Sequence, residues 1–300
     1  MLLILRIRIM TIKEKLATLR KLMEREGLDA YIISGTDPHN NEYLPAAWQQ
    51  REWISGFTGS FGTVVVLKED AGLWTDTRYF IQAEKQLQDT GIRLHKLRIA
   101  DAIDYPEWLA SVLPADSRVG ADSFCTSVNE WKHLQAILEE KNIKLVDNSC
   151  LIGEIWLDRP ALPEGKIFSV SPEITGTSIS EKIGMIQNIL KDRKADYFLF
   201  SALDEIAWLY NIRGNDIAYN PVAISYAIVG REKSHLFIQP SKVGKETALQ
   251  LGQANIEIHD YHHLFLFLEQ LEKGKHFCID STSLNYAVFH RLTSLFVLEE

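Results

Sequence analysis

The chain opens a helix with Thr11-Ile-Lys-Glu14 and repeats the arrangement with Ser178-Ile-Ser-Glu181. In both stretches a hydroxyl residue is followed three positions later by Glu, which is the capping-box signature of a helix start. Apolar residues at helical spacing follow each box: Ile12, Leu16, Leu19, Leu22 and Met23, then Ile183, Ile186, Ile189 and Leu190. A predicted strand comes next, at residues 28–34 and 196–201. The sequence therefore starts the same helix and strand twice.

This internal duplication can be followed along the chain. An offset of 167 (179 − 12) joins Ile12 to Ile179, Asp29 to Asp196, Ser34 to Ser201 and Asp37 to Asp204. The offset becomes 155 at Trp53 and Trp208, and 158 at Asp122 and Asp280. Steps of this kind indicate two homologous domains that differ by small loop insertions.

Within each unit, amphipathic helical patterns alternate with short β-rich runs. In the first unit the predicted strands are 63–67, 72–76, 92–97, 118–122 and 143–146, and the predicted helices are 77–88, 105–113 and 127–141. We predict an α/β fold with two tandem domains, each a mixed β-sheet flanked by helices. The expected divisions are a leader or start-site extension at 1–10, a first domain at 11–158, a Pro-containing linker at 159–177 and a second domain at 178–300.

Composition excludes several classes of protein. A formal charge of −8 and a pI near 5.6 argue against binding to nucleic acid or to an anionic membrane. No apolar run approaches the ~20 residues of a membrane span. Cys125, Cys150 and Cys278 are odd in number and widely spaced, which favours free thiols in a reducing compartment, so we expect a cytoplasmic protein.

Two loop-like stretches in the first unit carry candidate functional residues. In Asp37-Pro-His-Asn-Asn-Glu-Tyr43, His39 is a candidate for substrate binding on a loop, while Asp37 is equally suited to hold that loop as an Asx turn. Ser55-Gly-Phe-Thr-Gly-Ser60 lacks the lysine of a P-loop and the third glycine of a dinucleotide fingerprint. Its glycines are therefore expected to serve backbone geometry.

Arg78 follows a predicted strand end and lies two residues after Asp76. A guanidinium there can bind a carboxylate or peptide carbonyls in a bidentate manner, or it can form a structural ion pair with Asp76. From the residues alone both roles stay open. In the second unit, the charged groups at Asp204-Glu205 and Arg213-Gly-Asn-Asp216 are assigned to packing at the domain interface.

Other chemistries find little support. His259-Asp-Tyr-His-His263 is the densest histidine cluster, but it opens an amphipathic helix and lacks HExxH spacing, so no metal site is predicted on this chain. No G-x-S-x-G elbow is present, and no catalytic residue is assigned. A nuclease-like pair of the strand-end carboxylates Asp76 and Asp122 stays a weak alternative because the chain is acidic.

Several motifs together carry a family resemblance. They are Asp37-x-His-x-x-Glu-Tyr43, Ser55-Gly-Phe-Thr-Gly-Ser60, Leu73-Trp-Thr-Asp-x-Arg-Tyr-Phe80, Ile155-Trp-x-Asp-Arg-Pro160, Ala202-Leu-Asp-Glu-Ile-Ala-Trp-Leu209, Asn211-x-Arg-Gly-x-Asp216 and Asn220-Pro221. In this order they resemble the two N-terminal domains of the three-domain Xaa-Pro aminopeptidases of the creatinase/prolidase family. Thr77 departs from the pattern, which commonly has glycine there.

The resemblance implies a third, pita-bread domain that would follow Glu300 and bind two divalent metal ions, usually manganese, through five Asp, His and Glu ligands. The present residues would then be non-catalytic. They would wall the active-site mouth, limit access to short peptides with proline at the second position, and contribute Arg78, with His39 as a weaker candidate, to substrate binding. Family members often form homodimers, which the resemblance makes an option here. The alternative is a stand-alone peptide- or protein-binding module with an aminopeptidase-like fold and no catalysis.

Overall fold

The structure is a computed structural model that describes residues 10–148 and 151–300. The described chain divides into two compact units. The first comprises the residues up to Thr36, then Ala46–Thr126 and Glu130–Ala161, and the second comprises Asp37–Pro45, Ser127–Asn129 and Leu162–Glu300. The predicted leader, apart from its last residue, and Cys150 lie outside the described residues.

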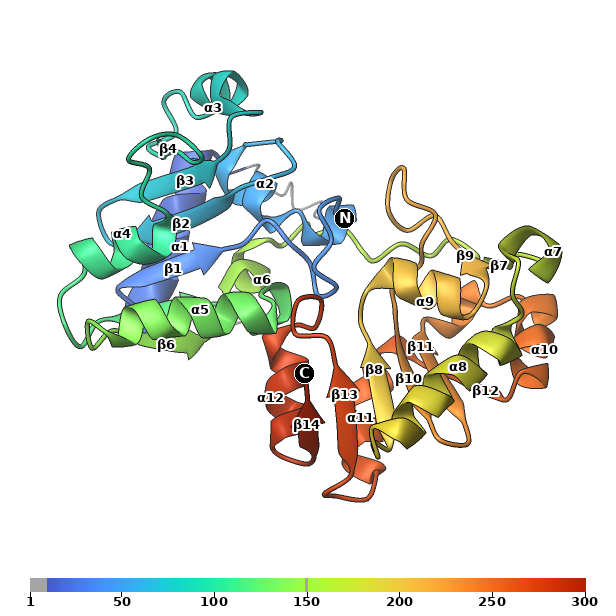
Figure 1. The fold of residues 1–300 in the computed structure, drawn as a ribbon. Coiled ribbons are helices and arrows are strands. Elements are labelled where there is room, and N and C mark those ends of the chain that lie inside the picture. The colour runs from blue at the N-terminus through green and yellow to red at the C-terminus, as the bar shows by residue number, and fades with distance from the viewer. Residues whose placement is uncertain (1–9, 149–150) are drawn as a thin grey trace, which may run out of the picture. The chain divides into compact units, whose positions relative to one another are not determined.

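The first half of the chain forms one six-stranded sheet with its helices (Figure 1). Its strands are β1 Ala30–Ile33, β2 Thr63–Leu67, β3 Ala71–Thr75, β4 Arg93–Lys96, β5 Arg118–Ala121 and β6 Lys144–Asp147. Its helices are α1 Ile12–Glu26, α2 Gln50–Ser55, α3 Phe80–Gln86, α4 Tyr105–Val112, α5 Val128–Glu139 and α6 Leu151–Ile155, with the 3₁₀ helices η1 Ala46–Trp48 and η2 Ser123–Cys125.

The second half forms another six-stranded sheet and one two-stranded sheet. Its strands are β7 Phe168–Ser169, β8 Tyr197–Phe200, β9 Ile212–Arg213, β10 Ser225–Gly230, β11 Ser234–Ile238, β12 Ile256–His259, β13 His276–Ile279 and β14 Val297–Glu299. Its helices are α7 Pro172–Thr175, α8 Ile179–Asp192, α9 Leu203–Leu209, α10 Lys245–Gln253, α11 Leu264–Gln270 and α12 Tyr286–Thr293, with η3 Pro240–Lys242 and η4 Tyr261–His263.

Both large sheets have the same topology. The strand orders are β4-β3-β2-β1-β5-β6 and β12-β11-β10-β8-β13-β14. In the first sheet β2 is antiparallel to both β3 and β1, and the remaining neighbours pair in parallel. In the second sheet β10 is antiparallel to both β11 and β8, and the remaining neighbours again pair in parallel. The predicted α/β fold with two mixed sheets is confirmed, and the shared topology is what a duplicated domain requires.

The two capping boxes begin equivalent helices, as predicted. The Thr11 hydroxyl accepts from the Glu14 amide while the Glu14 carboxylate accepts from the Thr11 amide, and Ser178 and Glu181 make the same pair at the start of α8. Such caps stabilise a helix by about 1 kcal/mol. They also fix the residue at which each unit begins its first helix.

Each sheet buries both faces under helices. In the first unit one face packs on α1 through Leu16, Leu19 and Met23. The other face carries Trp74, whose ring packs against Tyr105 and Trp108 of α4. In the second unit α8 and α10 cover one face and α11 and α12 the other, so both sheets are central layers of three-layer units (Figure 1).

The structure also departs from the expected register. Asp204 lies in the first turn of α9, whereas Asp37 lies in a loop well before the equivalent helix α2. The offset of 167 therefore ends before this pair, because the first unit has extra residues after β1. The stretch predicted as a linker contains α7 and also β7, which pairs antiparallel with β9.

No helix in the described ranges, 10–148 and 151–300, is long and apolar enough to cross a membrane. Of the cysteines that the structure describes, Cys125 and Cys278 are both buried and neither is part of a disulfide.

Candidate functional site

Arg78 and Asp76 form a tight ion pair directly after β3. Arg78 Nε lies 3.1 Å from both carboxylate oxygens of Asp76, and Arg78 Nη2 lies 3.0 Å from Oδ2. The Arg78 amide also donates to Asp76 Oδ1 at 3.1 Å. The Asp76 side chain is 1% exposed and that of Arg78 is 50% exposed. A buried carboxylate therefore holds a guanidinium that is half exposed to solvent.

A second arginine adds positive charge to the same carboxylate. Arg98 Nη1 lies 3.4 Å from Asp76 Oδ2, with a side chain that is largely exposed. The guanidinium carbons of Arg78 and Arg98 lie 5.8 and 5.4 Å from the centre of the Phe61 ring, within the range of cation–π contact. The hydrogen bonds from Arg78 lower the pKa of Asp76, so the carboxylate is charged at neutral pH. Two cations on one anion give this group of three side chains a net positive charge.

The neighbouring loop at residues 59–62 is held by hydrogen bonds from a buried arginine, Arg51. Arg51 donates through Nη1 to the carbonyls of Ser60 at 3.3 Å and Gly62 at 3.1 Å, and through Nη2 to the carbonyl of Gly59. Burial lowers the pKa of Arg51 to about 10, so it remains a cation at neutral pH. Because the loop carries Phe61, Arg51 supports the ring on which Arg78 and Arg98 rest.

The glycines of the stretch Ser55–Ser60 serve backbone geometry, as predicted from the sequence. Gly56 has φ 75° and ends α2 in the left-handed conformation. A Cβ on Gly59 would lie only 2.3 Å from the Phe57 ring and 2.8 Å from Tyr79. Neither glycine cradles a phosphate in this arrangement.

Asp37 organises the loop that carries His39. Its carboxylate accepts from the His39 amide at 3.0 Å and from the Asn41 amide at 3.1 Å, which is the Asx-turn role considered above. Residues 37–45 belong to the second unit. There the Pro38 carbonyl accepts from Asn285 Nδ2 at 2.8 Å.

His39 itself is buried rather than displayed. Its Nδ1 lies 2.9 Å from the Ser201 carbonyl and its Nε2 lies 3.0 Å from the Tyr261 hydroxyl, while the ring packs 4.4 Å from that of Tyr226. Desolvation lowers its pKa, so the imidazole is neutral at neutral pH. With 3% exposure and both nitrogens bonded, His39 has the geometry of a structural residue. No local pattern predicts this burial, because the partners of His39 lie at least 162 residues away along the chain.

The strand-end carboxylates Asp76 and Asp122 are not neighbours. They follow β3 and β5, which are separated in the sheet by β2 and β1. Three strand spacings amount to about 14 Å, which is too far for both carboxylates to share one metal ion. The nuclease-like alternative therefore loses its geometric basis.

Asp122 instead caps η2, where its carboxylate accepts from the Phe124 amide at 2.9 Å. Burial raises its pKa to about 6, with a further contribution from Asp147. A folded-state pKa above the unfolded value of about 4 means that the native state binds the extra proton, so stability falls as pH rises between these values.

For Asp122→Asn we expect this pH dependence to disappear. When the pH rises from about 5 to about 7.5, ionisation of Asp122 lowers the free energy of unfolding of the wild-type chain by about 1.5 kcal/mol. The asparagine keeps an acceptor for the Phe124 amide but has no charge to gain. Urea denaturation at the two pH values measures the difference. Equal pH dependence in wild type and variant would contradict the assignment. Exposed Asp116→Asn is the matched control.

The remaining sequence candidates also have defined places. Asp216 is buried inside the second unit, where it is ion-paired with Lys242 Nζ and accepts from the Ile224 amide at 2.7 Å. The His259–His263 cluster is divided, since His259 ends β12 while His262 and His263 lie on η4.

Comparison with known families agrees with this architecture. Residues 15–155 and residues 158–299 each match the Creatinase/Prolidase N-terminal domain. The chain therefore consists of two tandem domains of this type and belongs to the creatinase/prolidase family.

Whole-chain relatives specify which members it resembles. Aminopeptidase P2 of Arabidopsis thaliana is 38% identical over 283 residues, covering 92% of this chain and 40% of the relative. Xaa-Pro aminopeptidase 1 of Dictyostelium discoideum is 38% identical over 282 residues, covering 91% and 45%. The chain thus spans less than half the length of these relatives and is homologous to the N-terminal part of Xaa-Pro aminopeptidases.

A solved structure gives the same result. The X-prolyl aminopeptidase of Caenorhabditis elegans, described as a cytosolic enzyme with a di-nuclear active site, superposes with a TM-score of 0.90 at 32% identity. The match covers 96% of this chain and 50% of that enzyme.

Proposed function

We propose that this chain is the non-catalytic N-terminal portion of an Xaa-Pro metalloaminopeptidase that releases the residue preceding proline. The observation that carries the proposal is the homology of both units to the N-terminal part of such enzymes, together with the spans of 40% and 45% of the relatives' lengths. Its partner in catalysis is a following domain that holds two divalent metal ions. Its substrates are short peptides with proline at the second position, in the cytoplasm.

The metal-ligating side chains in the described part of the chain do not fit a two-metal centre. Among the described residues, the group whose ligand atoms converge is His235, Glu257 and His259, which is three ligands rather than the five that the resemblance implies. We therefore derive no catalytic step from these residues. When bound by its own domain, the metal pair would supply the nucleophilic hydroxide.

The role proposed for the present residues is to bind and restrict the substrate. Arg78 is the residue we assign to substrate contact, because its guanidinium is held in one orientation by Asp76 and is half exposed beside Arg98. A guanidinium held in one orientation can donate two hydrogen bonds to a carboxylate or to peptide carbonyls. His39, by contrast, is assigned a structural role.

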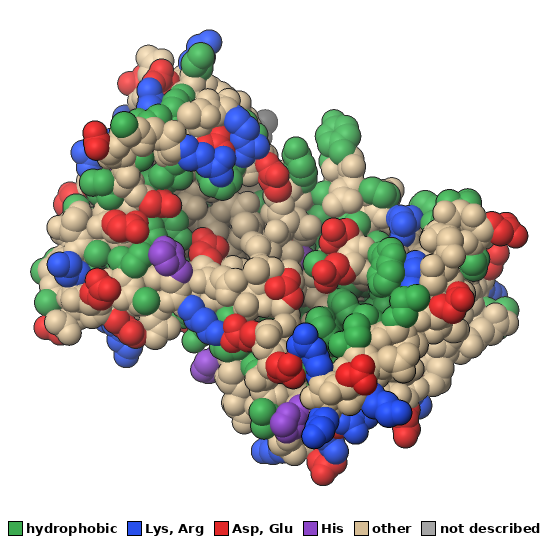
Figure 2. Space-filling model, in the orientation of Figure 1, with side chains coloured by type: hydrophobic (Ala, Val, Ile, Leu, Met, Phe, Trp, Pro, Cys, Tyr) green, Lys and Arg blue, Asp and Glu red, His purple; other side chains and the backbone are tan. Residues whose placement is uncertain are grey.

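The second unit offers a surface for further polypeptide. Figure 2 shows apolar side chains gathered over α8 and α9, where Met185, Ile189 and Trp208 are exposed by 52%, 44% and 47%. Exposed apolar surface of this kind marks protein–protein contact. It supports a partner such as the catalytic domain or a second copy in a homodimer.

In an enzyme that carries this chain with its catalytic domain, Arg78→Ala is expected to lower kcat/KM about 10- to 100-fold, because a charge-assisted bidentate contact contributes about 1.5–3 kcal/mol. Metal content should not change. Arg78→Lys keeps the charge but loses the fork, so it should recover only part of the activity.

The matched control is Arg93→Ala, which removes another exposed arginine of the same unit that pairs with Asp70. It should leave kcat/KM unchanged. If Arg78→Ala also leaves kcat/KM unchanged while the protein is folded, Arg78 has no part in substrate binding.

The non-catalytic assignment has its own test. The 300-residue chain, supplied with Mn²⁺, is expected not to cleave an Arg-Pro-Pro peptide. Turnover above background that survives repurification would overturn the proposal and favour a hydrolase site within these residues. Peptide binding without turnover, in the absence of any catalytic domain in the gene product, would instead favour a stand-alone binding module.

A further inference from the structure

Two adjacent strands of the second sheet bring a second set of functional groups together. In the parallel pairing of β11 with β12, His235 lies opposite Glu257 and Phe237 lies opposite His259. Residues opposite one another, and residues two apart on one strand, point to the same face of a sheet. His235, Glu257 and His259 therefore share one face, although His235 and His259 are 24 residues apart in sequence.

Their ligand atoms converge at the distances of a metal centre. His235 Nδ1 lies 3.1 Å from His259 Nε2 and 3.5 Å from Glu257 Oε2, and His259 Nε2 lies 4.0 Å from the same oxygen. In a tetrahedral zinc site, bonds of about 2.0–2.2 Å place ligand atoms about 3.3–3.5 Å apart. Shifts of a few tenths of an ångström would bring all three atoms into that range.

The three side chains offer a cation two nitrogen lone pairs and one carboxylate oxygen. Two imidazole nitrogens and a carboxylate oxygen are lone-pair donors, and they face one another with room for only one shared proton between the two rings. The other oxygen of Glu257, Oε1, is paired with Lys233 Nζ, which directs Oε2 toward the histidines. Such a partner on the far side of a ligand orients it as outer-shell groups do in metal sites.

The surroundings leave one side of the cluster open. The Phe267 ring of α11 lies 4.6 Å from the His235 ring and 5.2 Å from the His259 ring, forming an apolar wall. Side-chain exposure rises from 10% at His235 to 26% at His259 and 45% at Glu257. The fourth position of a tetrahedron therefore faces solvent.

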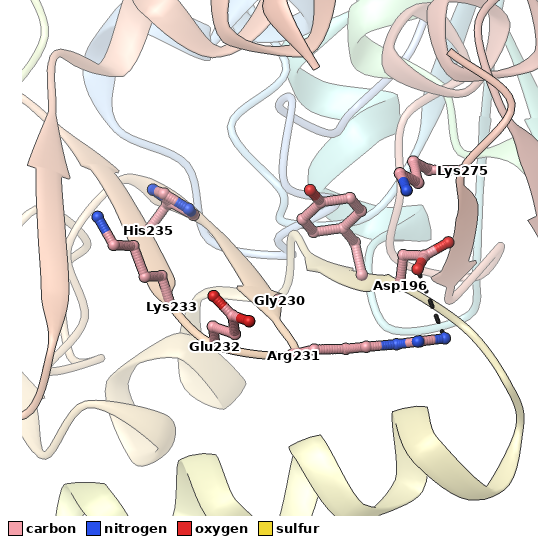
Figure 3. A pocket seen from close by; sticks show the side chains of 8 residues that line it. Asp196, Gly230, Arg231, Glu232, Lys233, His235 and Lys275 are labelled. Carbon is pink, nitrogen blue, oxygen red and sulfur yellow. Dashed lines mark ion pairs between the residues drawn. The ribbon is translucent and has the colours of Figure 1, made fainter. Parts of the chain in front are cut away.

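His235 also lines a pocket of about 260 Å³. Figure 3 shows His235 and Lys233 on one side of this pocket, with Asp196 and Lys275 across from them. The pocket therefore brings solvent to His235.

We propose that His235, Glu257 and His259 bind one divalent transition-metal ion of the zinc class, with water as the fourth ligand. Two imidazoles and one carboxylate suit zinc and its neighbours better than magnesium or calcium, which prefer oxygen ligands. Because β12 is the edge strand of its sheet, the ion would clamp that edge to β11.

The test uses the untagged 300-residue chain after treatment with EDTA and buffer exchange. Zn²⁺ titrated in competition with a chromophoric chelator should bind at one equivalent in the micromolar range or tighter, and should raise Tm. Co²⁺ should give the intense visible absorption of a tetrahedral site. His259→Ala is expected to weaken Zn²⁺ binding at least about tenfold and to reduce the rise in Tm accordingly.

Glu257→Gln is the second variant, because it keeps the shape of an exposed side chain while removing its charge; it too should weaken binding. His290→Ala removes an exposed histidine on α12 and should bind Zn²⁺ as wild type does. The proposal is overturned if folded wild-type chain shows no saturable binding up to about 1 mM Zn²⁺. It is also overturned if His259→Ala and Glu257→Gln bind as tightly as wild type.

Discussion

Asp216→Ala is expected to destabilise the second unit by about 3–5 kcal/mol, which is the range seen when one partner of a buried ion pair is removed. The Lys242 and Asp216 side chains are 2% and 0% exposed, so the substitution would leave an ammonium group in the core without its counter-charge. The Ile224 amide would lose its acceptor as well. Urea denaturation followed by far-UV circular dichroism measures the loss.

The control for this prediction is Asp204→Ala, since Asp204 is an exposed aspartate on α9. Its effect should stay within about 0.5 kcal/mol. The double variant Asp216→Leu with Lys242→Met should recover much of the lost stability, because a buried pair replaced as a whole leaves no unpaired charge. A loss below about 1 kcal/mol for Asp216→Ala would mean that water or another group reaches Lys242.

Arg51→Met is the second substitution with a large expected effect, about 3 kcal/mol on the first unit. The apolar side chain retains much of the volume but leaves the carbonyls of Gly59, Ser60 and Gly62 without their donor, and each unsatisfied buried carbonyl costs about 1–3 kcal/mol. Tryptophan fluorescence during denaturation reports this unit, which contains six of the seven tryptophans.

Arg51→Met should also have a local signature. Because the loop carries Phe61, backbone amides around residues 59–62 should exchange hydrogen faster than in wild type under native conditions. Exposed Arg93→Met should change neither stability nor exchange. Unchanged exchange at these amides would contradict the view that Arg51 fixes the loop beneath Arg78.

Local sequence patterns predicted most of the fold. Capping boxes and apolar periodicity depend on residues three or four positions apart, so Thr11, Glu14, Ser178 and Glu181 could be placed without the structure. The strand Thr63–Leu67 was predicted with its observed bounds because its run of β-branched residues is also a local pattern. The duplication followed from comparing the halves, and it failed only at Asp37 and Asp204, where added residues after β1 break the register.

The candidate site was predictable only in part. Arg78 and Asp76 are two residues apart, so their pairing was among the roles considered, although substrate contact stays a proposal. The burial of His39 depends on Ser201, Tyr226 and Tyr261, which no local pattern connects to it. His259 belongs to a histidine cluster in the sequence, but only the pairing of β11 with β12 brings His235 and Glu257 beside it.

Residues 37–45 leave the first sheet after β1 and are built into the second unit before the chain returns at Ala46. The second unit is thus discontinuous in sequence, because it includes a segment from the first half of the chain. A fragment ending near Ala161 would retain this segment but would lack its hydrogen-bond partners. These are the Ser201 carbonyl and the Tyr261 hydroxyl, which contact His39, and Asn285, which donates to the Pro38 carbonyl. Expressing either half by itself would therefore strand polar groups that the intact chain satisfies, so dissection of this protein calls for point substitutions rather than truncation.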